Sequence, residues 1–254
     1  MFKNFKPIIS ALFNEAIQEP SVLCKALEIA SEGPLQVCYI PFDHINYNAK
    51  LVIVGITPGH TQLVNAIKES KRCIDQGLSD EETLLRAKAT AAFSGTMRPN
   101  LISLLDCIEL QHWLGLSTCA ELFTTASNLV QNTSVLRHPV FMNGENYNGS
   151  PDMTRHPILR QQLVEHFGAE AKSLHDAVFL PLGDKVTAAL QYLSDLGYID
   201  RSRILLGLPH PSGANAERIA YFVGRKTKSD LSSKTNPEKL DQAREALRAQ
   251  VRAL

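Results

Sequence analysis

The run LVIVGI at residues 51–56 limits the possible folds of this chain more than any other stretch. It is apolar throughout, rich in β-branched residues, and stops at Thr57-Pro58-Gly59. A strand without a polar face must be covered on both sides, which is typical of parallel sheets. Because a helical pattern follows at about 61–76, we predict a strand–turn–helix unit of an α/β protein.

Strand-like and helix-like segments alternate along the rest of the chain. We predict further strands at 36–40, 122–126, 177–182 and 203–208, and helices at about 61–76, 80–92, 99–111, 157–167, 183–197 and from 214. Residues 131–156, rich in Asn, Gly and Pro, are expected to form a long surface loop. The predicted fold is a doubly wound, mostly parallel, four-stranded central sheet flanked by helices, with ligands bound at the carboxyl ends of the strands.

We expect residues 1–254 to form a single domain with a core at about 35–225. Two N-terminal helices within 1–32 and a C-terminal helix at 237–253 would be additions to that core. Asn236 and Pro237 have the residue types of an N-cap and a first helical position. Arg244, Arg248 and Arg252 recur every four residues and share a helix face, which we expect to be solvated rather than DNA-binding. The helix itself is expected to be a packing element or a dimer contact.

Composition excludes some classes of protein. Lys+Arg and Asp+Glu balance at 26 each, so the net charge favours no partner. The five cysteines form no CxxC pair, which argues against a zinc ribbon, an iron–sulfur cluster or a disulfide framework. We therefore expect reduced thiols, no metal and no cofactor. No apolar stretch approaches the roughly 20 residues of a membrane span, and we expect a cytoplasmic protein.

Two motifs with chemical potential lie at predicted strand ends. In GITPGH (55–60), Gly55 and Gly59 let the backbone approach a ligand, although the motif is equally typical of a tight turn. In HPSGAN (210–215), His210 can donate a hydrogen bond to an oxyanion. Ser212 and the following N–H groups can hold a phosphate at a helix N-terminus.

Two further residues have both a structural and a functional interpretation. Phe93, in the loop AAFSGTMRPNL (91–101), is either a core residue or a flat face on which a base stacks. Asn128, after the predicted strand 122–126, is either a turn residue or a reader of the O4/N3–H edge of a pyrimidine.

Together and in this order, GITPGH, Phe93-Ser94-Gly95, Asn128 and HPSGAN resemble the motifs of the uracil-DNA glycosylase superfamily. The resemblance covers roughly residues 35–225. It implies a hydrolase of base-excision DNA repair that cleaves the N-glycosidic bond of a flipped base. DNA with uracil or another modified base, single-stranded or mismatched, is the partner that the resemblance implies.

The resemblance also implies a role for each matching residue. The base pocket would contain Gly55, Ile56, Pro58, Gly59, Phe93 and Asn128. Phe93 would stack on the base, Asn128 would read its edge, and His210 would stabilise charge on its oxygen. The DNA phosphates would be held by Ser212, Gly213, Asn215 and Arg218.

The first motif departs from the family pattern. The family has Asp or Asn where this chain has Thr57, or Glu where it has Ile56. Thr57 can hydrogen-bond a water but is no general base, and such a base contributes typically about 10²–10⁴-fold. We therefore expect slow catalysis or a base from elsewhere, with His60, Glu145 and Asp152 as candidates. Gly59 replaces a bulky family residue, which suggests room for a larger base, and Ala214 is a poor wedge.

Three functions remain open from the sequence. The first is a divergent glycosylase that uses His210, Thr57 and His60. The second is a catalytically weak or inactive module that binds flipped bases, because Thr57 replaces the usual catalytic residue. The third is a nucleotide or small-ligand enzyme on the same scaffold, since fold does not fix function.

Overall fold

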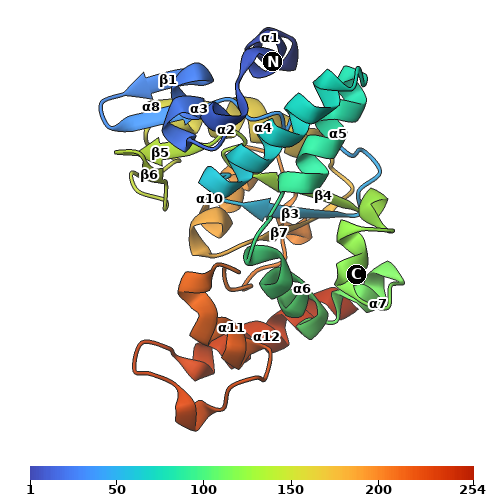
Figure 1. Ribbon diagram of the computed structural model, residues 1–254. Coiled ribbons are helices and arrows are strands. Elements are labelled where there is room, and N and C mark those ends of the chain that lie inside the picture. The colour runs from blue at the N-terminus through green and yellow to red at the C-terminus, as the bar shows by residue number, and fades with distance from the viewer. The chain divides into compact units, whose positions relative to one another are not determined.

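A computed structural model describes all residues, 1–254, as an α/β protein with two sheets (Figure 1). The first sheet has three parallel strands in the order β4-β3-β7, and the second has four antiparallel strands in the order β1-β2-β5-β6. The chain forms two compact units. The first unit contains 1–45, 55–94 and 132–173, and the second contains 46–54, 95–131 and 174–254.

The predicted buried strand is confirmed as β3 (Leu51–Gly55), which is buried along its whole length. It pairs in parallel with β7 (Val178–Pro181), which matches the prediction at 177–182. On its other side lies β4 (Val130–Ser134). The covered apolar run therefore forms the middle strand of the parallel sheet, as its lack of polar alternation predicted.

The expected fourth parallel strand at 203–208 is reduced to a single bridge between Phe179 and Ile204. The run cannot extend the ladder because Gly207 has φ +116° and Pro209 has no N–H to donate. The central sheet thus has three regular strands instead of four.

The predicted strand at 122–126 is also wrong. Residues Cys119–Phe123 form a 3-10 helix, and its start is fixed by Thr118, whose side chain accepts from the N–H of Ala120. The side chain of Glu121 accepts in turn from the Thr118 N–H. These local hydrogen bonds favour the 3-10 helix although the run is partly apolar. The strand itself begins at Val130, eight residues later than expected.

The N-terminal segment contains three helices and a strand instead of two helices. These are α1 (Phe2–Ala11), α2 (Asn14–Ile17), α3 (Pro20–Ala26) and β1 (Glu28–Glu32). A turn at Gly33, with φ +56°, returns the chain into β2 (Leu35–Cys38), which pairs with β1. Pairing with the buried β2 stabilises β1 as a strand although its own sequence is largely polar.

The expected loop at 131–156 contains most of β4 and a hairpin. The hairpin strands are β5 (Val140–Met142) and β6 (Glu145–Asn146). Asn143 and Gly144 connect them with φ values of +52° and +78°. Asn-Gly with two positive φ angles is typical of a tight hairpin turn, so the residues that suggested a loop are the turn of a sheet.

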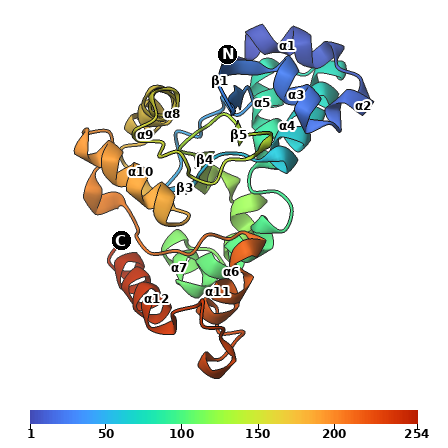
Figure 2. The same ribbon diagram turned by 90° about the vertical axis from the view of Figure 1, so that its left-hand side faces the viewer.

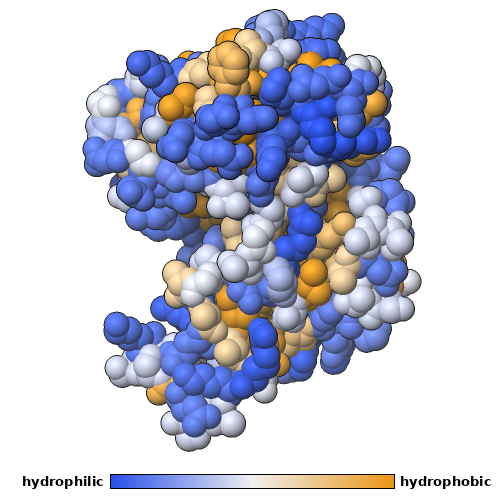
Figure 3. Space-filling view, viewed as in Figure 1, coloured by the Kyte–Doolittle hydropathy of each residue, from blue (hydrophilic) through white to orange (hydrophobic).

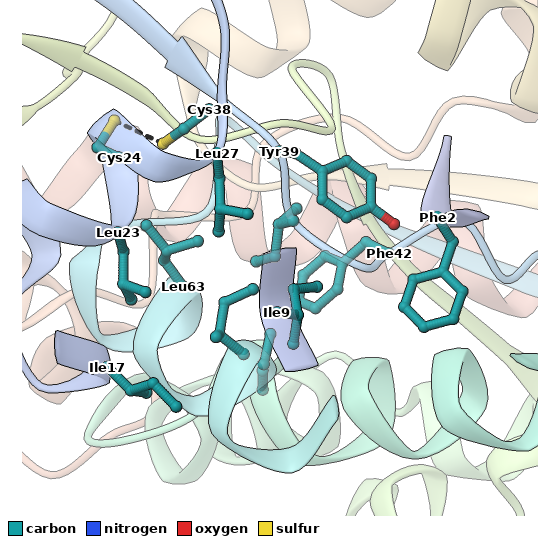
Figure 4. Packing of buried hydrophobic residues seen from close by; sticks show 14 of the residues in the cluster. Phe2, Ile9, Ile17, Leu23, Cys24, Leu27, Cys38, Tyr39, Phe42 and Leu63 are labelled. Carbon is teal, nitrogen blue, oxygen red and sulfur yellow. Dashed lines mark hydrogen bonds between the residues drawn. The ribbon is translucent and has the colours of Figure 1, made fainter. Parts of the chain in front are cut away.

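The helices of the first unit cover its hydrophobic core. Helices α4 (His60–Asp75) and α5 (Asp80–Ala91) lie side by side (Figure 1), and α1, α2 and α3 pack on α4. Figure 4 shows the core that these helices share with β2 and the segment after it, where Phe2, Ile9, Leu23 and Leu63 belong to one buried cluster with Cys38, Tyr39 and Phe42. The unit also contains α8 (Pro157–Gln162), a π-helical segment (Leu163–Gly168) and α9 (Ala169–Ser173).

Charged groups are also buried in the first unit. Arg137 binds Glu170 at 2.7 Å, and the Glu170 side chain is fully buried. The Nζ of Lys88 donates to the carbonyl oxygen of His44 at 2.6 Å, and burial lowers the pKa of Lys88 to about 8. By contrast, large hydrophobic side chains are exposed at Met1, Ile8, Phe13, Val22 and Leu85, among the largely hydrophilic residues seen over this unit (Figure 3).

The second unit combines β7 and most of β3 with the C-terminal helices. Helix α10 (Asp184–Asp195) follows β7, and α6 (Met97–Cys107) and α7 (Leu110–Leu114) precede β4. Helix α11 (Ala216–Phe222) packs on α12 (Pro237–Arg252), as Figure 2 shows. Asn236 accepts from the N–H of Lys239, which confirms the predicted N-cap.

The arginine face of α12 is solvated only at Arg252, whose side chain is 65% exposed, whereas Arg244 and Arg248 are largely covered. Arg244 donates to the carbonyl oxygen of Phe222, Arg248 donates to that of Cys107, and Arg252 binds both carboxylate oxygens of Glu109. The four-residue spacing therefore places three cations along one docking face, where they satisfy carbonyl and carboxylate oxygens of other helices.

Two global properties of the chain complete the description. No helix combines the length and apolar character needed to cross a bilayer. All five cysteines are free, and no three His, Cys, Asp or Glu side chains come together as a metal site.

Candidate functional site

The first motif forms the turn between β3 and α4, in the first unit. The carbonyl oxygens of Gly55 and Ile56 accept from the N–H groups of Val135 and Leu136, which continue from β4. Gly59 is the N-cap of α4, and its N–H donates to Oε1 of Gln62 at 2.9 Å. The turn is therefore held at both ends, at the carboxyl edge of the parallel sheet.

The hydroxyl group of Thr57 is committed to the backbone of the adjacent segment. It donates to the carbonyl oxygen of His138 at 3.1 Å and accepts from the N–H of Val140 at 3.1 Å. Its single proton is thus used, and one lone pair is left. In this arrangement Thr57 fastens the first motif to β5, and it can accept from a water but cannot donate to one.

The start of α4 is covered by the hairpin β5–β6. Asn146 Oδ1 accepts from the N–H of His60 at 3.0 Å. The same oxygen lies 3.0 Å from the position that a Cβ would have at Gly59, so the space beside this glycine is occupied by Asn146. The His60 ring stacks on Phe141, with ring centroids 4.4 Å apart.

The other two candidates for a general base lie outside the first motif. Glu145 is exposed on β6, and Asp152 is exposed in the following loop, where its carboxylate accepts from the N–H and hydroxyl of Thr154. Of the three candidates for a general base, only His60 is part of the first motif.

Phe93 packs directly against Gly55 within the first unit. A Cβ at Gly55 would lie 3.1 Å from Cε1 of Phe93 and 3.3 Å from Oγ of Ser134. Phe93 itself has φ +51°, a left-handed conformation that costs a residue with a bulky side chain about 1–2 kcal/mol. Strain of this kind persists where the surrounding structure enforces it and is frequent at functional sites.

Asn128 does not follow a strand. It lies in the short turn Ser127–Leu129 before β4, its side chain is exposed, and its carbonyl oxygen accepts from Asn46 Nδ2 at 2.9 Å. This is the amino end of β4, where the Leu129 carbonyl oxygen accepts from the N–H of Lys50 just before β3. Ligands of parallel sheets bind at the other end, so this position does not suit a base reader.

The sequence reasoning missed Asn132, which lies on β4 itself. Its Oδ1 is buried and has no hydrogen-bond partner. Because side chains alternate along a strand, Asn132 shares a face with Ser134, whose Oγ lies beside Gly55 and Phe93. A buried amide oxygen needs a hydrogen-bond donor, which water or a ligand can supply.

The second motif positions His210 in the second unit. Nδ1 of His210 accepts from the N–H of Ser212 at 3.2 Å. In a neutral ring the proton is then on Nε2, which becomes the single donor of the imidazole. Burial lowers the pKa of His210, so the neutral ring is favoured at neutral pH.

Two residues that the sequence analysis did not select support this loop. Gly183, at the start of α10, has φ +90°, and a Cβ there would lie 3.3 Å from the Cβ of His210. Asn100 of α6 donates to the carbonyl oxygen of Pro211 at 3.0 Å. The loop is thus fixed from two sides, which orients the imidazole.

The predicted phosphate-binding residues follow His210 as one short turn. Gly213–Asn215 form a 3-10 helix that runs into α11, and Asn215 Oδ1 accepts from Arg218 at 3.0 Å. Gly213 is exposed, and so is Arg218. The first N–H groups of a helix have no partner within it, so this turn presents donors and one guanidinium to solvent.

The structure therefore groups the predicted residues into two sets. The first unit brings together Gly55, Ile56, Thr57, Pro58, Gly59, His60 and Phe93, with Asn132 and Asn146 added. The second unit brings together His210, Ser212, Gly213, Asn215 and Arg218, with Gly183 and Asn100 added.

The fold and these loops define an α/β protein with polar and glycine-rich loops at the carboxyl ends of its parallel strands. The chain is 34% identical over 214 residues to the uncharacterized protein YoxB of Bacillus subtilis (strain 168), a match that spans 83% of this chain and 84% of the relative. The chain thus belongs to the same family as YoxB. No protein-family model matches the sequence, and no solved structure matches it significantly.

Proposed function

We propose that this protein is a divergent DNA glycosylase of the uracil-DNA glycosylase superfamily that excises uracil or another modified base from DNA by base flipping. The environment of His210 carries the proposal, because Nδ1 is occupied by the Ser212 N–H and Nε2 is left as a donor. When the N-glycosidic bond breaks, the electron pair goes to the base and negative charge develops on its carbonyl oxygen. A fixed neutral donor stabilises such a charge without reorganisation.

The first unit supplies groups suited to holding the base. Phe93 would stack on its face, and such stacking contributes about 1–3 kcal/mol. Asn132 would take the reading role that the sequence suggested for Asn128. Its unpaired Oδ1 would accept from N3–H of a pyrimidine, while Nδ2 would donate to O4. Gly55 leaves the ring of Phe93 in place, because a Cβ there would push the ring away by a few tenths of an ångström.

Few side chains of the first motif can orient or deprotonate the attacking water. Thr57 offers one lone pair, which can orient a water but cannot deprotonate it. His60 is the ionisable side chain of the first motif, and its ring is stacked on Phe141. We therefore expect slow hydrolysis driven mainly by departure of the base.

The test uses a labelled single-stranded oligonucleotide with one central uracil and a large excess of protein. Alkali then cleaves the strand wherever a base has been lost. We expect cleavage at the uracil with the wild-type protein and its loss in His210→Ala. The matched control is His175→Ala, because the His175 side chain is 75% exposed and lies outside both motifs. Full cleavage by His210→Ala would overturn the proposed mechanism.

A second function is supported by one observation, the commitment of the Thr57 hydroxyl to the His138 carbonyl oxygen and the Val140 N–H. A protein in which this residue only fastens a turn could bind flipped bases without cleaving them. It would then show salt-sensitive binding to uracil-containing DNA and no alkali-labile product. A Thr57→Asn variant that gained activity would favour this second function.

A further inference from the structure

Two cysteines in the first unit lie in direct contact. Cys24 on α3 and Cys38 at the end of β2 are 14 residues apart in sequence, and their Sγ atoms are separated by 2.6 Å (Figure 4). They are 3% and 0% exposed, respectively. Thiols with no bond between them normally keep a wider separation, so the backbone already places the two sulfur atoms close to bonding distance.

The other three cysteines have no such neighbour. Cys73 contacts Glu69, Cys107 contacts the Phe222 carbonyl oxygen and Arg248, and Cys119 lies next to Asp106. Cys24 and Cys38 are therefore the one pair in this chain that the fold has arranged for a covalent link.

We propose that Cys24 and Cys38 form a disulfide-forming modification site that responds to hydrogen peroxide. The hydrogen bond with Cys24 and burial raise the pKa of Cys38, so Cys24 is the sulfur that attacks a peroxide oxygen as a thiolate. It becomes a sulfenic acid, and the O–O bond breaks with release of one water. The second sulfur then displaces the sulfenic oxygen as a second water, and the S–S bond forms. Two S–H bonds are lost, the sulfur pair is oxidised by two electrons, and the peroxide is reduced to two waters.

The link would join two elements that support the first motif. The N–H of Cys38 donates to the carbonyl oxygen of Pro139 at 3.0 Å. Pro139 lies between His138 and Val140, the two residues whose backbone groups hold the Thr57 hydroxyl. The disulfide would thus anchor β2, and through one hydrogen bond the segment that fixes the first motif, to α3. This inference does not depend on the proposed glycosylase function.

The experiment counts thiols in the intact protein. Fully reduced folded protein is treated with hydrogen peroxide, quenched, denatured, and titrated with a thiol reagent, and its peptides are mapped by mass spectrometry without reduction. We expect the count to fall from five to three, with a crosslinked peptide that joins residues 24 and 38. The unfolding midpoint of the oxidised protein should rise by roughly 5–10 °C, because the closed loop restricts the unfolded chain.

Two variants make the assignment specific. Cys24→Ser should keep all four remaining thiols and show no rise of the midpoint after peroxide. Cys119→Ser, in which an equally buried cysteine is removed, should still lose two thiols. The proposal is overturned if the wild-type protein keeps five thiols, if the crosslink joins another pair, or if peroxide only adds oxygen to single cysteines. The peptide map of the wild type decides this even where a variant fails to fold.

Discussion

Gly183 lies against His210 so closely that a Cβ on the glycine would be 3.3 Å from the Cβ of the histidine. The glycine begins α10 directly after β7, whereas the histidine follows the segment that bridges to β7 at Phe179. Two neighbouring loops of the sheet edge thus lie so close that a side chain at position 183 would displace His210 by a few tenths of an ångström. The position of the imidazole depends on this contact as well as on the hydrogen bond from Ser212.

The first prediction tests this contact with Gly183→Ala. We expect loss of stability of about 1–3 kcal/mol, because φ +90° and ψ 167° lie in a region that is essentially restricted to glycine. We also expect a large loss of base excision, because His210 must move. Gly197→Ala is the matched control, since Gly197 also has positive φ, +77°, but nothing within 4 Å of its Cβ position. Equal activity losses in the two variants, measured under single turnover, would contradict the role of the contact.

The second prediction concerns the pH dependence of excision. The pKa of His210 is lowered from 6.5 by burial, so the neutral donor should persist below that pH. The rate of a single turnover should therefore stay constant as the pH falls through 6.5 and decline only in more acidic solution. A rate that increases as His210 becomes protonated would show that the imidazolium is the active form. His210→Gln, which keeps an N–H donor, should lose this acid decline.

The same shift has a consequence for folding. Below pH 6.5 the unfolded chain protonates this histidine while the folded protein does not, so the unfolded state binds more protons. The stabilisation that comes from keeping His210 neutral is complete above pH 6.5. It is lost as the pH falls toward the pKa of His210 in the folded protein. His138, whose pKa is lowered well below 6.5 mainly by burial, should act in the same direction. Urea unfolding of the wild type and His138→Gln at several pH values measures this effect.

The third prediction separates Asn132 from Asn128. Asn132→Leu should lower the excision rate by about 10²-fold, because it removes the groups that read the base. The same change should raise the free energy of unfolding by about 1 kcal/mol, because it removes a buried oxygen that has no partner. Asn128→Leu, at an exposed turn, should leave the excision rate unchanged. An excision rate that falls with Asn128→Leu but not with Asn132→Leu would favour Asn128 as the residue that reads the base.

The fourth prediction concerns the buried ion pair between Arg137 and Glu170. Glu170→Gln should cost about 3–5 kcal/mol of stability, because it leaves a guanidinium that is only 12% exposed without its carboxylate. The exposed pair Arg86–Glu82 provides the control, and Glu82→Gln should change stability by at most about 0.5 kcal/mol. Chemical denaturation measures the stability loss of each variant. Similar losses for Glu170→Gln and Glu82→Gln would refute the difference between the buried and the exposed ion pair.

The sequence predicted those parts of the fold whose residues carry the signal locally. Residues 51–56 and 177–182 are apolar runs, and both became buried parallel strands. Strand β4 gives no such signal because its sequence, VQNTS, is mostly polar although four of its five residues are buried. Gln131 is satisfied by a distant residue, since its Oε1 accepts from the N–H of Asn46. Only tertiary contacts make such a segment a strand.

The same reason explains why the sequence places Asn128 at a strand end. A strand predicted at 122–126 puts Asn128 directly after it and leaves Asn132 inside an expected loop. The residues of GITPGH and HPSGAN were found because glycine, proline and histidine mark turns in the sequence itself. The glycine opposite His210 was not found, because its role depends on a neighbouring loop.

The division of the chain into units has a consequence for attempts to take the protein apart. The backbone crosses from one unit to the other after residues 45, 54, 94, 131 and 173. Neither unit is a continuous stretch, so no truncation of the gene can express one of them alone. A single proteolytic nick after residue 54, 94 or 131 would leave two fragments that both contribute to both units. Such fragments should stay associated and co-purify, and they would be a natural starting point for a split, complementing version of the protein.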